Sequence, residues 1–240
     1  MVEDINNCPF KEGSNGVDIA DEMLILFLQA VTSVSKDYLN YNIGITDGEG
    51  LIKQHQERVF AYELYHKWSC LLEERNLFDQ GWVINAELSK HLDWFYYDDS
   101  ELEAKRIKEG ASTDLKFPDL VLHQGQEHQG NNLIVCEIKR GNYVNEDNLY
   151  KDIYKLYRLT MGGSASKIPE DGRASLPFKY GVFLSLDKRV EDVTFVNVCE
   201  ELALSEDSKK KILCVEAFVD ENTDKLNFKC RWLADICRNG

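Results

Sequence analysis

Hydrophobic residues recur every three or four positions along three long segments of the chain, at residues 17–38, 53–76 and 146–161. This spacing is typical of amphipathic helices. Asp18, Asp21 and Glu22 add acidic side chains that favour the first turns of the first helix. The third segment stops before two consecutive glycines, a common helix end. We therefore predict these three helices, with shorter ones near residues 100–108 and 193–204.

Other segments alternate or are rich in β-forming residues, and they predict strands. Residues 82–88 alternate apolar and polar side chains, which is the pattern of a half-buried strand. Two β-rich segments flank a loop with Gly125 and Gly130, so we predict a hairpin. The order of elements predicts an α/β fold, a mixed β-sheet flanked by helices. The hairpin strands and the later strands are expected at residues 117–123, 132–140, 178–186, 212–219 and 225–233.

The composition is that of an ordinary globular protein, and we expect residues 1–240 to form a single domain. Hydrophobic residues make up 43% of the chain and charged residues 29%, which indicates no extended disorder. The acidic start lacks the pattern of a secretory signal, and no apolar run reaches the roughly 20 residues of a membrane span. The 7 cysteines show no metal-binding spacing. We expect reduced thiols, no structural zinc, no membrane contact and a cytoplasmic location.

The net charge of -14 opposes binding to a polyanion, but the charge is unevenly distributed. Residues 1–100 carry 7 basic and 18 acidic side chains, residues 101–190 carry 14 and 13, and residues 191–240 carry 7 and 11. The net charges are therefore -11, +1 and -4. Any contact with a nucleic acid is expected to involve the middle segment.

The predicted hairpin carries the strongest candidate chemistry. Glu137 and Lys139 are two residues apart on one strand, so their side chains lie on the same face. Asp119 begins the partner strand, and opposite residues in an antiparallel pair have Cβ atoms about 5 Å apart. Charges on an apolar strand need a partner or a metal. Asp119 and Glu137, with the Ile138 carbonyl as an optional further ligand, suit Mg²⁺ or Mn²⁺, and Lys139 would orient a metal-bound water or contact a phosphate.

The pair Pro118-Asp119 followed by Glu137-Ile138-Lys139 resembles the motif of the PD-(D/E)XK nuclease superfamily. The resemblance covers roughly residues 53–186 and implies a restriction-endonuclease-like fold, here with an extra N-terminal helix. It implies a metal-dependent nuclease that hydrolyses phosphodiester bonds, with DNA the expected nucleic acid and RNA the other option. It also implies an acidic metal ligand on the preceding helix, where Glu63 is the matching position and Glu87 on the first strand is a rival.

Several other interpretations remain open at this stage. Asp119 can be a simple turn residue and Glu137 with Lys139 a charge pair on an edge strand. The chain can also be a catalytically inactive relative of the nucleases that serves in interaction or assembly. Its acidity further suggests that a basic partner subunit or DNA-binding domain presents the substrate, and a homodimer is a separate option.

Three more groups of residues invite a binding role beside a simpler one. His123, His128 and Glu127 can bind a metal or be solvated turn residues. Residues 94–97 (WFYY) can stack on bases or form a packed contact. Lys151, Lys155 and Arg158 lie at helical spacing and can follow phosphates or form an ordinary solvated face.

Overall fold

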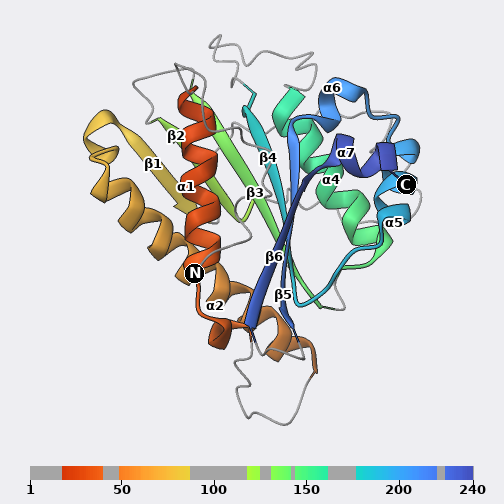
Figure 1. The fold of residues 1–240 in the computed structure, drawn as a ribbon, viewed down its shortest axis with the longest axis horizontal. Helices are drawn as coiled ribbons and strands as arrows, with labels where there is room; N and C mark the ends of the chain where they lie inside the picture. The colour runs from red at the N-terminus through yellow and green to blue at the C-terminus, as the bar shows by residue number, and fades with distance from the viewer. Residues whose placement is uncertain are drawn as a thin grey trace.

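The structure is a computed structural model that describes residues 18–39, 49–86, 118–124, 131–141, 144–161, 177–220 and 225–239. The described strands form one six-stranded sheet in the order β1-β2-β3-β4-β5-β6 (Figure 1). The strands β3, β4 and β5 run parallel, whereas β1–β2, β2–β3 and β5–β6 are antiparallel pairs. The strands are β1 (Trp82–Ala86), β2 (Leu120–Gln124), β3 (Asn132–Arg140), β4 (Tyr180–Leu186), β5 (Ile212–Asp220) and β6 (Lys225–Trp232).

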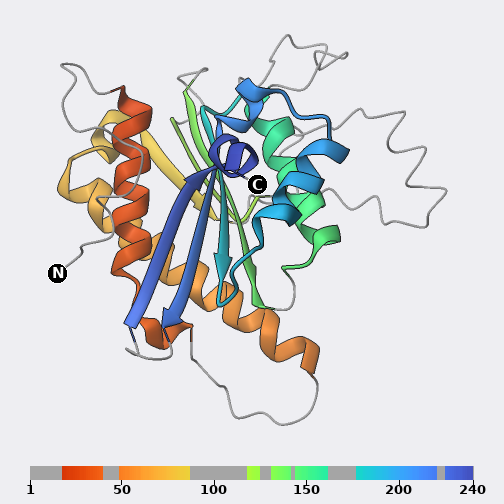
Figure 2. The same cartoon turned by 45° about the vertical axis from the view of Figure 1, so that its right-hand side comes forward.

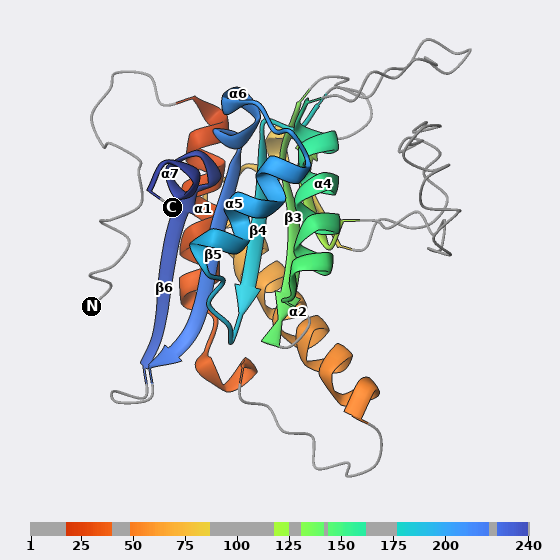
Figure 3. The same cartoon turned by 90° about the vertical axis from the view of Figure 1, so that its right-hand side faces the viewer.

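Helices cover both faces of this sheet, so the described part of the chain has three layers (Figure 2). One face packs against α1 and α2, and the other against α4, α5 and α7, with α4 and α5 together on that side in Figure 3. Short 3₁₀ helices, η2 and η3, follow α1 and α2. The helices are α1 (Ile19–Ser33), η2 (Lys36–Tyr38), α2 (Glu49–Glu74), η3 (Phe78–Gln80), α4 (Glu146–Met161), α5 (Asp192–Glu201), α6 (Glu206–Lys209) and α7 (Leu233–Asn239).

The central strand β3 sends alternate side chains into the two halves of the core. Ile134, Cys136 and Ile138 pack with the apolar faces of α1 and α2. Val135, on the opposite face, belongs to the cluster built around α4 and α5. Because side chains alternate along a strand, Glu137 and Lys139 lie on the α4 side with Val135. The alternation therefore places two charged residues beneath a helix.

The helix α4 approaches the sheet closely at Gly181 of β4. A Cβ atom added to this glycine would lie 3.2 Å from Leu156 Cβ and 3.3 Å from Thr160 Cγ2. Those distances are tighter than ordinary van der Waals contacts, so the absence of a side chain on Gly181 allows α4 to lie low on the strand. The close packing brings the inner face of α4 within reach of the charges on β3.

Most of the predicted elements are confirmed, with shifts at their ends. The first helix ends at Ser33 instead of continuing to residue 38, because Ser35 caps the separate η2 turn. The helix predicted to begin at residue 53 begins at Glu49. The hairpin is confirmed as β2 and β3, and α4 matches its predicted range. The α/β class with a mixed sheet flanked by helices is therefore correct.

The C-terminal end differs from the prediction. The last predicted strand ran to residue 233, but β6 ends at Trp232 and the chain continues as α7. The buried side chains of Leu233 and Ile236 explain this helix, because they pack into the cluster under α5. The short helix α6 was also not predicted, whereas the helix predicted near residues 100–108 lies outside the described residues.

Two further expectations concern cysteines and membranes. The 6 cysteines that the structure describes are free thiols, and Cys136 is fully buried in the core. None of the described helices has the length and apolar character needed to cross a membrane.

Candidate functional site

The hairpin places Asp119 immediately beside the charged end of β3. Leu120 pairs with Cys136, so Asp119, one residue earlier, lies next to Glu137. The Asp119 amide donates a hydrogen bond of 3.1 Å to the Cys136 carbonyl oxygen. Its carboxylate Oδ2 accepts a hydrogen bond of 2.6 Å from the Ile138 amide. Two backbone contacts therefore fix both the chain and the side chain of Asp119.

Glu137 is almost completely buried, with 1% of its surface exposed. Its Oε2 atom lies 2.6 Å from the Lys155 ammonium on α4. Its Oε1 atom is also buried, and no described residue donates a hydrogen bond to it. Burial raises the pKa of Glu137 even though Lys155 opposes this shift, and the nearby Asp119 and Asp152 raise it further. Glu137 is therefore a carboxyl group whose negative charge is only partly compensated.

Lys139 lies between two other carboxylates. Its Nζ atom is 3.8 Å from Asp152 Oδ2 and 3.9 Å from Glu57 Oε1. Burial disfavours its charge, but Asp152, Asp119, Glu137 and Glu57 together raise the pKa of the ammonium above its ordinary value. Lys139 is therefore a cation at neutral pH, so it can donate hydrogen bonds but cannot accept a proton.

The helix α4 contributes two charged residues that the sequence analysis did not assign to the site. Asp152 and Lys155 are both buried and lie three residues apart, so they share the inner face of the helix. Lys155 pairs with Glu137, which corrects the interpretation of Lys151, Lys155 and Arg158 as one solvated face. Asp152 falls within the apolar stripe of α4 at 100° per residue, whereas Lys155 lies at the edge of this stripe, about 40° beyond Leu159.

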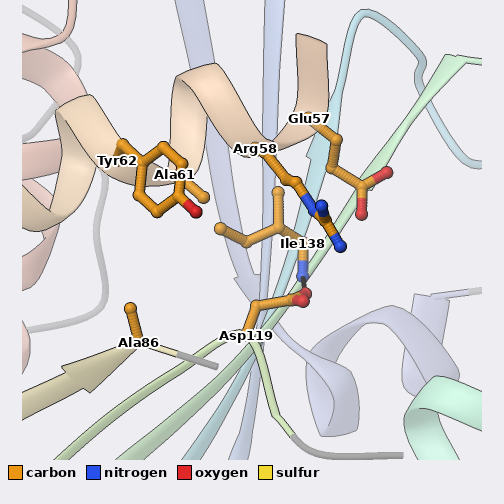
Figure 4. Close-up of a pocket in the computed structure, with 7 residues that line it drawn as sticks. All are labelled: Glu57, Arg58, Ala61, Tyr62, Ala86, Asp119 and Ile138. Atoms are coloured by element: carbon orange, nitrogen blue, oxygen red, sulfur yellow. Dashed lines mark hydrogen bonds between the residues drawn. The ribbon is translucent and has the colours of Figure 1, made fainter. Parts of the chain in front are cut away.

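A pocket with a volume of about 220 Å³ opens between α2 and the hairpin (Figure 4). Four neighbouring side chains of α2 form one wall, and the end of β1, Asp119 and Ile138 form the rest. Figure 4 shows the Glu57 and Arg58 side chains extending from α2, and Asp119 held by the Ile138 amide across from them. The lining residues are Glu57, Arg58, Ala61, Tyr62, Ala86, Asp119 and Ile138.

The acidic residue that α2 brings to this pocket is Glu57, and the predicted Glu63 lies elsewhere. Glu63 forms ion pairs on its own helix, 3.3 Å from Lys67 and 3.8 Å from His66. Six residues separate it from Glu57, which corresponds to roughly 120° around a helix. Burial raises the pKa of Glu57 to about 7, with Lys139 opposing the shift and Asp119 and Asp152 adding to it. Glu57 and Asp119 therefore interact, as two residues of one site do.

The remaining candidates have other surroundings or fall outside the described part. The His123 ring lies 2.9 Å from Asn85 Nδ2 and 2.8 Å from the Gln124 carbonyl oxygen, so both its nitrogens have partners other than a metal. Lys151 is exposed on α4. Predictions for Glu87, Glu127, His128 and residues 94–97 concern positions that the structure does not describe.

Within the described ranges, no three histidine, cysteine, aspartate or glutamate side chains are arranged to hold a metal ion by themselves. The pocket offers two carboxylates instead, Glu57 and Asp119. Comparison of the chain with protein-family models, curated proteins and solved structures finds no match. Any functional assignment therefore depends on the geometry of this site.

Proposed function

We propose that the chain is a Mg²⁺-dependent nuclease with a restriction-endonuclease-like core, and that it hydrolyses phosphodiester bonds in DNA. The observation that carries this proposal is the pocket that joins Glu57 of α2 to Asp119 of the hairpin, with the Lys139 ammonium 3.9 Å from Glu57. The succession of α2, the three antiparallel strands, α4 and the parallel β4 supports the same assignment.

The balance of charges in the site supports a divalent cation. Glu137 with Lys155 and Asp152 with Lys139 form two pairs of opposite charge. Glu57 and Asp119 remain as two further carboxylates, and both line the pocket. Their combined charge matches that of one divalent ion. An all-oxygen donor set with only two pocket carboxylates suits Mg²⁺, which keeps several of its own waters and uses few protein ligands.

Each side chain of the site has a separate role in the proposed hydrolysis. Glu57 and Asp119 hold the ion, whereas Glu137 is paired with Lys155 on the α4 side and does not line the pocket. Bound Mg²⁺ lowers the pKa of a water molecule and offsets negative charge on the phosphate. Lys139 donates hydrogen bonds that orient the attacking water or the phosphate, because its raised pKa keeps it protonated. In this proposal Glu57 takes the role that the sequence assigned to Glu63.

Incubation of the purified chain with plasmid or single-stranded DNA tests the proposal. Cleavage is expected with Mg²⁺ or Mn²⁺ and not with a chelator. Asp119→Ala, Glu57→Gln and Lys139→Ala should abolish it, whereas Glu63→Gln, a matched change on the same helix, should retain it. If Asp119→Ala and Lys139→Ala cut as fast as the unmodified chain, the proposal is wrong.

A second candidate is a non-catalytic interaction module with the same fold, and the Glu137–Lys155 pair favours it. The Lys155 ammonium, 2.6 Å from the Glu137 carboxyl group, supplies a counter-charge without any metal. Titration calorimetry separates the two functions. A nuclease should bind Mn²⁺ with measurable heat that is lost in Asp119→Asn, and a pure interaction module should show no heat in either protein.

A further inference from the structure

Besides the carboxylate of Glu57, the wall of the pocket formed by α2 carries a guanidinium and an aromatic ring. Arg58 and Tyr62 lie four residues apart, so their side chains project from the same side of the helix. Tyr62 is 58% exposed although it lines the pocket. Two small side chains, Ala61 and Ala86, line the same pocket (Figure 4). An aromatic face and a guanidinium thus stand beside the proposed metal ligands.

This combination matches the chemistry of one nucleotide unit. Nucleobases stack on aromatic side chains regardless of sequence, because every base has a π face. A guanidinium presents a planar set of donors that fits phosphate oxygens. The same pocket is lined by Arg58, Tyr62 and Asp119, so a donor group for a phosphate and an aromatic ring for a base both lie beside a proposed metal ligand.

We propose that the substrate is single-stranded DNA, with one unpaired base stacked on Tyr62 and the adjacent phosphate contacting Arg58. This inference depends on the proposed nuclease function and adds the substrate class. A base in a duplex already has stacked neighbours on both faces, so it presents no free face to a tyrosine unless it is unstacked.

The charge of the chain favours a short unpaired segment over a duplex as well. Duplex binding relies on many phosphate contacts with basic side chains, and the chain has a net charge of -14. Stacking supplies affinity that does not depend on a basic surface.

Binding to a short single-stranded oligonucleotide that contains one 2-aminopurine tests the inference, because stacking on tyrosine quenches the fluorescence of this base. The assay uses the full chain with Mn²⁺ and the Lys139→Met change, which prevents cleavage under the proposed function. Tyr62→Ala should weaken binding by roughly 5- to 150-fold, the range measured for loss of one stacked base, and should remove the quenching. Tyr62→Phe should retain both.

Tyr65→Ala is the matched control, because Tyr65 lies on the same helix with 37% exposure and does not line the pocket. It should bind and quench like the parent protein. Equal losses in Tyr62→Ala and Tyr65→Ala, or duplex bound as tightly as the single strand, would overturn the inference. Neither result depends on cleavage. Failure of the nuclease proposal would appear separately, as intact DNA in the Mg²⁺ assay.

Discussion

Replacing Glu57 by glutamine tests the electrostatics of the site through the stability of the protein. The pKa of Glu57 rises from 4.5 to about 7 because the carboxyl group is buried. Between these values the folded state holds a proton that the unfolded state has released. The free energy of unfolding therefore falls as pH rises through this range, because the folded protein must keep a buried carboxylate.

The size of the effect follows from the difference in pKa. The rise of the pKa from 4.5 to about 7, at about 1.4 kcal/mol for each tenfold change in acidity, gives a loss of roughly 3 kcal/mol that is complete by about pH 8. The Glu57→Gln variant has a side chain of nearly the same size and no proton to lose. Between about pH 4.5 and pH 8, the free energy of unfolding of the unmodified chain should therefore fall by roughly 3 kcal/mol more than that of the Glu57→Gln variant.

Urea unfolding across this pH range, without divalent metal, measures the difference. Glu63→Gln is the control, because Glu63 lies on the same helix with Lys67 and His66 and outside the pocket. Adding Mg²⁺ at pH 8 should restore stability to the unmodified chain and not to Glu57→Gln. The reasoning is refuted if the unmodified chain and Glu57→Gln show the same pH dependence, or if Glu63→Gln is the variant that removes it.

Three other predictions concern separate contacts. Lys155→Met leaves the buried Glu137 without its partner at 2.6 Å and should lower the free energy of unfolding in urea by roughly 3–5 kcal/mol, with Lys155→Arg destabilising less. Lys139→Met should abolish DNA cleavage while Mn²⁺ still binds in calorimetry, and loss of the binding heat would contradict the separation of roles. Arg231→Met removes two hydrogen bonds of 2.6 Å to Asp192 and should cost about 1–2 kcal/mol in thermal unfolding, because the pair is partly exposed.

The sequence predicted the hairpin well because both of its causes are local. The strand segments are rich in β-forming residues, and the loop between them contains turn-forming glycines. Once the hairpin exists, its antiparallel register fixes Asp119 beside Glu137, whatever the rest of the fold does. The same locality explains why α4 was found with its correct ends.

The choice between Glu57 and Glu63 could not be made from the sequence. Both lie on α2, and helical periodicity defines which residues share a face without stating where that face meets the hairpin. The packing of Phe60, Leu64 and Trp68 against α1 and the sheet sets the rotation of α2. That rotation directs Glu57 and Tyr62 to the pocket and leaves Glu63 with Lys67.

The two charged residues of α4 were missed for a different reason. A lysine in a polar helix is most often solvated, so Lys155 was grouped with Lys151 and Arg158. Its position at the edge of the apolar stripe did not by itself indicate burial, and a buried ammonium needs an anionic partner. The sequence does not identify that partner. The packing of α4 over β3 in the structure shows that it is Glu137.

The distribution of charge explains how a strongly acidic chain can present a site for a polyanion. The chain as a whole has a net charge of -14. Lys139 of β3 and Lys155 of α4 nevertheless lie where the helix packs on the sheet, and each forms an ion pair with a carboxylate there. These lysines compensate Glu137 and Asp152, and Lys139 also lies 3.9 Å from Glu57, which lines the pocket with Asp119. A divalent ion bound there neutralises the two pocket carboxylates that an approaching phosphate meets. The ion, together with Arg58 at the wall, then takes the place of a basic surface.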